Sequence, residues 1–174
     1  MQDKIKKTAS VIKMGGVALV PTDTVCGIAA CCDNEDAIRR IYEIKNRNQD
    51  KPLAMLVSSI ESVWERVDKT AELEDSCSKY WPGAVTLIMS GKDGSPVGFR
   101  MPDYEPLLEV IDITGPLCAT SANISGDEAP GRIEEVAEEI REKVDIIADF
   151  AAEPSGKPSK IINLCGGNAR VIRD

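Results

Sequence analysis

The chain contains no histidine among its 174 residues. Because histidine is the side chain whose ordinary pKa lies closest to neutral pH, its absence removes the usual acid–base catalyst and every Ser-His or Cys-His nucleophile pair. Any catalysis must therefore rest on charge stabilisation, substrate positioning, a carboxylate, a lysine or a metal ion. The six cysteines form no Cys-x-x-Cys pair, so we expect reduced, partly buried thiols and no zinc site.

Aromatic residues, positive charge and long apolar runs are also scarce. Trp, Tyr and Phe number two, three and two, and 21 Lys and Arg face 29 Asp and Glu, which gives a net charge of −8. This composition argues against binding nucleic acid through a broad basic surface. No apolar run approaches the ~18 residues that a membrane span needs, and residues 1–7 lack the apolar core of a signal peptide. We expect a cytoplasmic protein that does not associate with a membrane.

Short apolar segments alternate with segments of helical periodicity along the whole chain. The expected strands are residues 17–20, 53–57, 85–89, 97–101, 117–120, 144–148, 160–164 and 170–172. The expected helices are residues 5–14, 34–45 (capped by Asp33), a segment capped by Ser58 or Ser59 that ends at 65, 71–80, 106–113 and 133–143. The small residues 27–30 are assigned to neither class. Without a strict βαβ repeat, this order predicts one α/β or α+β domain over residues 1–174, with an open, twisted mixed sheet flanked by helices.

Three cations, Lys45, Arg47 and Lys51, lie within seven positions of this acidic chain and lead directly into an apolar strand. Such a cluster is suited to binding a phosphorylated ligand. A second interpretation is structural, because cations at the end of the predicted helix 34–45 would complement its dipole without any functional role. This segment alone leaves both interpretations open.

Further polar segments stand where a predicted strand or helix opens into a loop. They are residues 22–24, Arg100 and residues 120–123. In open α/β sheets, ligands gather where loops leave the strand ends. The Thr-Ser-x-Asn segment offers hydroxyls, an amide and backbone N–H groups for phosphate or adenine, although Ser and Asn are equally typical of an ordinary turn.

Five motifs occur in a fixed order along the chain. They are Pro21-Thr-Asp-Thr-Val-Cys-Gly27, Lys45-Asn-Arg47 with Lys51-Pro-Leu53, Trp81-Pro-Gly83 with Thr86, Gly98-Phe-Arg-Met-Pro102 and Thr120-Ser-Ala-Asn-Ile-Ser-Gly126. Together they resemble the YrdC-type threonylcarbamoyl-AMP synthases, in the short, stand-alone form, over nearly the whole chain. Five ordered motifs are far more specific than any one of them.

The resemblance implies a YrdC-like fold and a nucleotidyltransferase that acts in tRNA processing. The family condenses L-threonine, bicarbonate or CO2, and ATP with Mg²⁺ into L-threonylcarbamoyladenylate and pyrophosphate. A downstream threonylcarbamoyl-transferase complex then carries the group to adenosine in tRNA, and a weak contact with RNA is compatible with this task. Charge develops on phosphate oxygens, so cations and oriented amides can supply the catalysis without histidine.

The resemblance also assigns roles to individual residues. Lys45 and Arg47 would be the catalytic cations that neutralise the triphosphate. Ser121 and Asn123 would hold the phosphate or adenylate end, with Arg173 as a further nucleotide contact. Thr22, Arg100 and Ser159 would bind threonine, Arg100 through a bidentate pair with the carboxylate. No protein side chain is assigned to the metal ion.

Four features depart from the family pattern. Cys26 stands where the family has tyrosine, which would reshape the threonine pocket, Ala84 replaces a proline, and Lys160 replaces a threonine. The segment Ala29-Ala-Cys-Cys32 is also atypical of the family.

Two other functions share the fold. One alternative is a non-catalytic RNA-binding module of the same fold, which the net charge and the few aromatics disfavour. The other is a carbamoyl-transfer domain of hydrogenase-maturation proteins, whose zinc-finger and acylphosphatase-like neighbours do not occur in this sequence.

Overall fold

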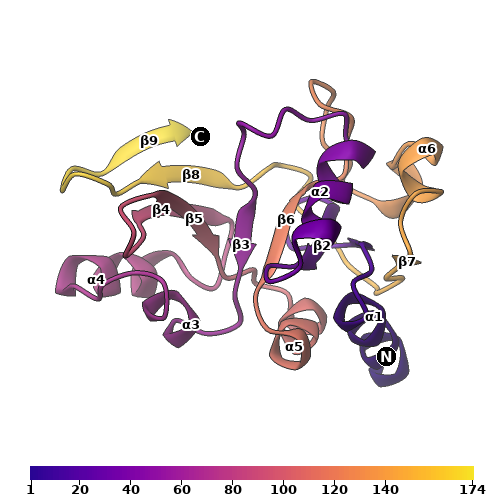
Figure 1. Ribbon diagram of the computed structural model, residues 1–174, viewed down its shortest axis with the longest axis horizontal. Helices are drawn as coiled ribbons and strands as arrows, with labels where there is room; N and C mark the ends of the chain where they lie inside the picture. The colour runs from indigo at the N-terminus through magenta and orange to yellow at the C-terminus, as the bar shows by residue number, and fades with distance from the viewer.

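Nine strands form one mixed sheet in the order β7-β1-β2-β6-β3-β5-β4-β8-β9, and the computed structural model describes residues 1–174 (Figure 1). The strands are β1 (Ala18–Val20), β2 (Gly27–Cys31), β3 (Ala54–Leu56), β4 (Val85–Ser90), β5 (Pro96–Arg100), β6 (Leu117–Ser121), β7 (Ile146–Ile147), β8 (Lys160–Asn163) and β9 (Arg170–Arg173). The helices are α1 (Gln2–Lys13), α2 (Glu35–Ile44), α3 (Glu61–Trp64), α4 (Ala71–Tyr80), α5 (Glu105–Thr114), the 3₁₀ turn η1 (Ile133–Glu135) and α6 (Glu138–Arg141). The predicted mixed sheet flanked by helices is confirmed.

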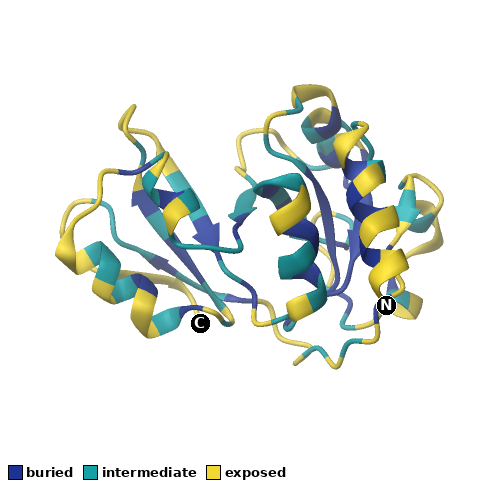
Figure 2. Cartoon of the chain, turned by 90° about the horizontal axis from the view of Figure 1, so that it is seen from below, coloured by how far each residue is buried: buried dark blue, intermediate teal, exposed yellow.

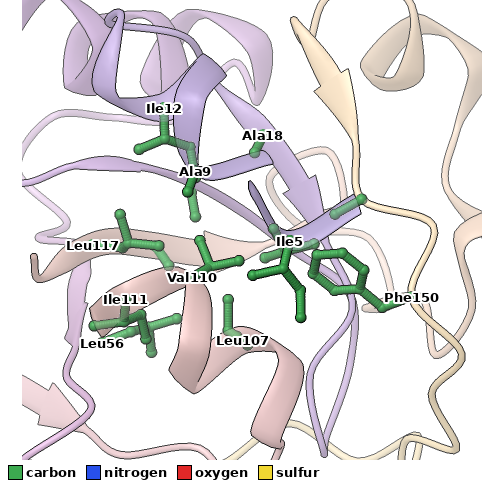
Figure 3. Close-up of a cluster of buried hydrophobic side chains, with 14 residues drawn as sticks. Ile5, Ala9, Ile12, Ala18, Leu56, Leu107, Val110, Ile111, Leu117 and Phe150 are labelled. Carbon is green, nitrogen blue, oxygen red and sulfur yellow. The ribbon is translucent and has the colours of Figure 1, made fainter. Parts of the chain in front are cut away.

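The half of the sheet built on β1, β2 and β6 is covered on both faces. Successive side chains of a strand point to opposite faces, so Ala18 and Ala29 join the cluster under α1 and α5 (Figure 3). Leu19 and Ile28 point the other way and pack with α2 and α6. This two-sided burial is why β1 and most of β2 carry no exposed side chain.

The other half, built on β5, β4 and β8, has helices packed against one face. Leu87, Phe99 and Ile162 pack there with α3 and α4. The alternating residues Thr86 and Arg100 point to the opposite face and line a pocket instead. Strand β3 joins the halves, because it pairs antiparallel with β6 and parallel with β5. Figure 2 shows both halves, with buried residues concentrated in the strands and on the inner faces of the helices.

Four details of the sequence prediction were wrong. The small residues at 27–31 form the central strand β2, because pairing with β1 and β6 on both sides outweighs their low strand propensity. Asn34, not Asp33, caps α2: its side-chain oxygen accepts from the N–H of Ala37 at 2.9 Å. Neither Ser58 nor Ser59 caps α3, which begins at residue 61 without a side-chain cap.

The fourth error concerns the predicted helix 133–143, which is broken into η1 and the single turn α6. The Glu135 carboxylate turns back to accept from the N–H groups of Gly131 and Arg132, at 2.8 and 3.1 Å. Val136 then takes extended backbone angles, which ends the turn and buries its side chain beside Ile140. By contrast, α4 has the predicted bounds, 71–80. No helix in the structure has both the length and the apolar character needed to span a membrane.

Candidate functional site

A pocket of about 200 Å³ opens where the two halves of the sheet meet. Its walls come from the loop between β1 and β2, the ends of β5, β6 and β9, and the starts of β3, β4 and β8. Three guanidinium side chains line it, those of Arg47, Arg100 and Arg173, and no aspartate or glutamate does. A strongly acidic chain has therefore gathered a locally cationic cavity, which favours an anionic ligand.

The loop between β1 and β2 is shaped by the hydroxyl of Thr22. This buried hydroxyl donates to the carbonyl of Val25 at 2.8 Å and accepts from the N–H groups of Thr24 and Val25 at 3.0 and 3.3 Å. The Thr24 hydroxyl lies 3.0 Å from it. The loop therefore has a fixed shape, and both threonines line the pocket.

Arg100 is buried at the end of β5, with 6% of its surface exposed. Its Nε donates to the Gly83 carbonyl at 3.1 Å, Nη1 to the Thr24 hydroxyl at 2.8 Å and Nη2 to the Asp23 carboxylate at 2.5 Å. Burial lowers the pKa of the guanidinium, and the Asp23 charge opposes that shift. The side chain is held rigidly, and two of its five N–H donors have no protein partner.

Ser159 and Arg173 form the side of the pocket contributed by β8 and β9. The Ser159 hydroxyl lies 2.9 Å from that of Thr86, and both are buried. Arg173 donates to the Ser159 carbonyl from Nε at 2.9 Å and from Nη2 at 2.7 Å. Partial burial, followed by the charge of Arg100, lowers the pKa of Arg173, so the two guanidinium groups influence each other.

Arg47 and Ser121 complete the pocket on the opposite side. Arg47 is half-buried and donates from Nε to the Lys51 carbonyl at 3.1 Å and from Nη2 to the Pro52 carbonyl at 3.2 Å. The Ser121 hydroxyl donates to Oδ1 of Asn123 at 2.6 Å. Asn123 itself is turned away, because its amide donates to carbonyls of the following loop at 2.9 and 2.8 Å.

Lys45 does not line the pocket, although it belongs to the cationic motif. The side chain is 1% exposed and lies behind the Ser121–Asn123 segment. Its ammonium donates to the carbonyls of Ser121 and, at 2.7 Å, of Asn123, with Oδ1 of Asn123 at 3.4 Å. Burial, followed by the nearby charge of Arg47, lowers the pKa of Lys45 to about 8. The backbone of Lys45 also accepts a hydrogen bond from Ser125 N–H, so this residue anchors the loop at both ends.

The structure thus brings six of the eight predicted site residues into one pocket: Thr22, Arg47, Arg100, Ser121, Ser159 and Arg173. Lys45 and Asn123 lie directly behind Ser121. The prediction omitted Thr24 and Thr86 as site residues. Both belong to the five motifs, but residue type alone does not reveal which hydroxyl faces a cavity.

Cys26 also lines the pocket, and it is not a suitable nucleophile. Burial, and then the charges of Glu135 and Glu134, raise the pKa of its thiol to about 11. Its sulfur lies 3.6 Å from the carbonyl of Gly131. A protonated thiol facing a carbonyl contributes shape rather than reactivity. The structure contains no cluster of three or more His, Cys, Asp or Glu side chains that could hold a metal ion.

Comparisons with known proteins identify relatives along most of the chain. The Sua5/YciO/YrdC family model, described as telomere recombination, matches residues 10–174. A Methanocaldococcus jannaschii protein provisionally named threonylcarbamoyl-AMP synthase is 36% identical over 171 residues, covering 92% of this chain and 80% of its own length. The threonylcarbamoyl-AMP synthase of Bacillus subtilis is 33% identical over 181 residues, covering 97% of this chain and 52% of that protein.

Solved structures give the same picture. A structure of Pyrococcus abyssi Sua5 complexed with L-threonine superposes with a TM-score of 0.86 at 29% identity, covering 97% of this chain and 53% of that one. Escherichia coli YciO superposes with a TM-score of 0.87 at 20% identity, covering 100% of this chain and 90% of that one, which shows the shared fold. The chain spans about half the length of the Bacillus and Pyrococcus relatives.

Proposed function

The chain belongs to the Sua5/YciO/YrdC family, and on that premise we propose that it is an L-threonylcarbamoyladenylate synthase. The substrates would be L-threonine, bicarbonate or CO2, and MgATP, and the products L-threonylcarbamoyladenylate and pyrophosphate. The observation that carries this proposal is the cationic pocket: three guanidinium groups and six hydroxyl-bearing threonine and serine side chains converge at the junction of the two half-sheets. Such a pocket suits a substrate pair with one carboxylate and three phosphates.

The threonine subsite would lie at Arg100. The guanidinium retains two N–H donors, and Asp23 and Thr24 fix its orientation. A planar guanidinium held in this way is suited to pair with a carboxylate. The Thr22 hydroxyl stands in the same wall, and the Thr86–Ser159 hydroxyl pair lines another, so polar partners are available for the amino acid's other groups.

The triphosphate would lie toward Arg47 and Arg173. In the reaction, an oxygen of threonine carbamate attacks the α-phosphorus and pyrophosphate leaves, so negative charge shifts along the phosphate oxygens. Fixed cations and backbone N–H groups aimed at those oxygens stabilise that charge more than they stabilise the ground state. Lys45 would support this indirectly, by holding the carbonyls of Ser121 and Asn123 so that the Ser121 hydroxyl keeps its place.

Magnesium would enter as part of MgATP. The pocket lining contains no carboxylate, and the chain provides no metal-binding cluster, so phosphate oxygens and water would supply the ligands. The adenylate product is a mixed anhydride, which an acceptor enzyme that modifies tRNA would consume. The product is therefore expected to leave this pocket intact.

The proposal is tested by incubating the purified chain with ATP, bicarbonate, Mg²⁺ and one amino acid at a time. Release of pyrophosphate that requires both threonine and bicarbonate is the expected result, with the adenylate detected by mass spectrometry. Pyrophosphate release without threonine, or no release by a folded chain, would contradict the proposal. A tRNA-binding assay of the same preparation separates this function from a purely RNA-binding one.

A further inference from the structure

Two cysteines, Cys32 just after β2 and Cys118 in β6, meet on the side of β6 opposite the pocket. Strand β2 pairs antiparallel with β6, so that Ala30 lies opposite Cys118. The neighbours Leu117 and Ala119 point into the cluster under α1 and α5, and Cys31 packs against that same cluster. Strand alternation therefore turns Cys118 and Cys32 to the opposite face, where their Sγ atoms lie 2.9 Å apart.

This pair differs from the other cysteines in its geometry. A disulfide has an S–S length of about 2.05 Å, so bonding requires the two sulfurs to approach by only about 1 Å. Cys32 and Cys118 are both partly exposed, which gives a small reagent access to them. Cys26 and Cys165, by contrast, have their sulfurs against backbone carbonyls.

Arg66 extends along the cysteine pair, and its charge favours the thiolate form of both sulfurs. Its Nε lies 3.3 Å from Sδ of Met55, the cross-strand partner of Cys118, and its Nη2 lies 3.4 Å from Oδ1 of Asp33, which follows Cys32. The hydrogen bond from Cys32, and next the charge of Arg66, lower the pKa of Cys118, while burial and the charge of Asp33 raise it. The pKa of Cys32 is raised, chiefly by the same hydrogen bond. Cys118 is therefore the first nucleophile, and Cys32 is the resolving thiol.

We propose that Cys32 and Cys118 form a reversible thiol–disulfide site that reacts with low-molecular-weight disulfides such as oxidised glutathione. The Cys118 thiolate attacks one sulfur of the reagent, which breaks its S–S bond, forms a mixed disulfide and releases one thiolate. Cys32 then loses its proton and attacks Cys118 Sγ, which forms the internal disulfide and releases the second thiol. Two protein thiols are oxidised, and one disulfide is reduced to two thiols.

The bridge would stabilise the fold without entering the pocket. It ties the end of β2 to β6 and closes a chain loop that contains α2, β3, α3, α4, β4, β5 and α5, which reduces the entropy of the unfolded chain. Ala119 and Ser121 line the pocket from β6, but Cys118 does not. This inference is independent of the proposed function, because it concerns the other face of the strand.

The test oxidises the folded chain with glutathione disulfide and counts thiols after denaturation. The wild-type chain has six thiols and is expected to retain four, with peptide mapping that joins Cys32 to Cys118 and full reversal by dithiothreitol. The thermal midpoint of the oxidised chain should exceed that of the reduced chain by roughly 5–15 °C. The Cys31→Ser variant is the matched control, since it also loses one of these neighbouring thiols but should still lose two more on oxidation and show the same rise.

The variants that remove the pair should behave differently. Cys32→Ser should accumulate the glutathione adduct on Cys118 without an internal bridge, and Cys118→Ser should lose the rapid reaction, both without the rise in midpoint. Circular dichroism of each reduced variant verifies the fold. The proposal is overturned if the bridge involves Cys31, if it forms only in denaturant, or if the folded wild type retains all six thiols or carries only glutathione adducts.

Discussion

The two sides of the pocket hold their polar groups in opposite ways. On one side, the Arg100 wall (Thr22, Thr24 and Arg100) places a buried cation at the cavity and fixes it with Asp23. On the other, the Lys45 wall (Lys45, Arg47 and Ser121) places its buried cation behind the cavity, bound to backbone carbonyls. The cation of this wall that faces the cavity is half-buried Arg47, beside the Ser121 hydroxyl.

This difference indicates how each wall meets its ligand. The Arg100 wall is preorganised, because its guanidinium, hydroxyls and carboxylate already bond one another. In the Lys45 wall, Arg47 is held only by two carbonyls of its own loop, so a ligand must compete with weak contacts to recruit it. Arg100 thus both stabilises its wall and binds the ligand. In the Lys45 wall these two tasks are divided: Lys45 stabilises the wall, and Arg47 binds the ligand.

The largest effect is expected for Arg100→Ala, which leaves the Asp23 carboxylate half-buried without its partner. We expect a loss of about 3–5 kcal/mol in the free energy of unfolding and of at least about 10³-fold in kcat/KM for threonine. Urea unfolding and the pyrophosphate assay measure the two. Arg40→Ala is the control, since Arg40 forms a more exposed pair with Asp145 at 2.7 Å, and it should cost about 1 kcal/mol or less and leave activity unchanged. A stable, active Arg100→Ala enzyme would refute the assigned role of this wall.

The sequence predicted the Arg100 wall better than the Lys45 wall, for a physical reason. Arg100 ends β5, and Thr22 lies in the tight loop just after β1, so strand alternation and the loop leave few directions for these side chains. Lys45 stands at the C-terminal end of α2, and a long flexible side chain there can reach the cavity or pass behind the next loop. Only the position of the Ser121–Asn123 carbonyls, set by β6, decides between them.

The fold shows the same limit. Strands with branched apolar residues, such as β4, were predicted from sequence, whereas β2 was not, because glycine and alanine give no periodic signal. The broken helix at 133–141 was missed because Glu135 turns back to the N–H groups of Gly131 and Arg132 and Val136 takes extended backbone angles, although no glycine or proline marks this break in the sequence. Local patterns identify elements, but partners elsewhere in the chain decide which of them persist.

The next largest effect is a pH dependence of the free energy of unfolding, which reports on the titration of Lys45. Its folded-state pKa of about 8 lies below the ordinary 10.5, so the unfolded chain binds the proton more tightly. Below pH 8 the folded chain bears the full cost of burying the charge, and the free energy of unfolding rises as pH increases from about 8 to 10.5. Relative to Lys45→Met, which removes this titration, the wild type should gain up to about 3 kcal/mol over that interval. Parallel pH profiles of the two proteins would refute the assignment.

At neutral pH, Lys45→Met should lower both stability and activity. The change leaves the carbonyls of Ser121 and Asn123 buried without a donor, which is expected to cost about 1–3 kcal/mol. Displacement of Ser121 should lower kcat about 10–100-fold in the folded fraction. Lys92→Met is the control, because Lys92 also donates to two backbone carbonyls, at 3.0 and 3.1 Å, but at an exposed position away from the pocket. Full activity per folded Lys45→Met molecule would show that Lys45 only ends its helix.

For Arg47→Ala we expect almost no change in stability and a loss of function that is confined to ATP binding. Its exposed bonds to Lys51 and Pro52 contribute little, so the free energy of unfolding should change by no more than about 0.5 kcal/mol. The KM for ATP should rise about 10–100-fold while the KM for threonine stays nearly constant. Steady-state kinetics with each substrate varied in turn measures both. A rise in the KM for threonine, with the KM for ATP unchanged, would place Arg47 at the threonine subsite and contradict this assignment.

The smallest effect is expected for Arg173→Gln. This variant tests whether Arg173 attracts the triphosphate through its charge alone. Arg173 lies on the exposed edge strand β9 and feels the charge of Arg100 across the pocket. Removing its charge weakens attraction for the triphosphate but also relieves repulsion between the guanidinium groups, so the KM for ATP should rise only about 2–5-fold. Part of that rise should disappear in high salt, because charges near the surface are screened. If the KM for ATP instead rises as much as in Arg47→Ala and the rise does not depend on salt, Arg173 bonds the nucleotide directly and does not act through its charge alone.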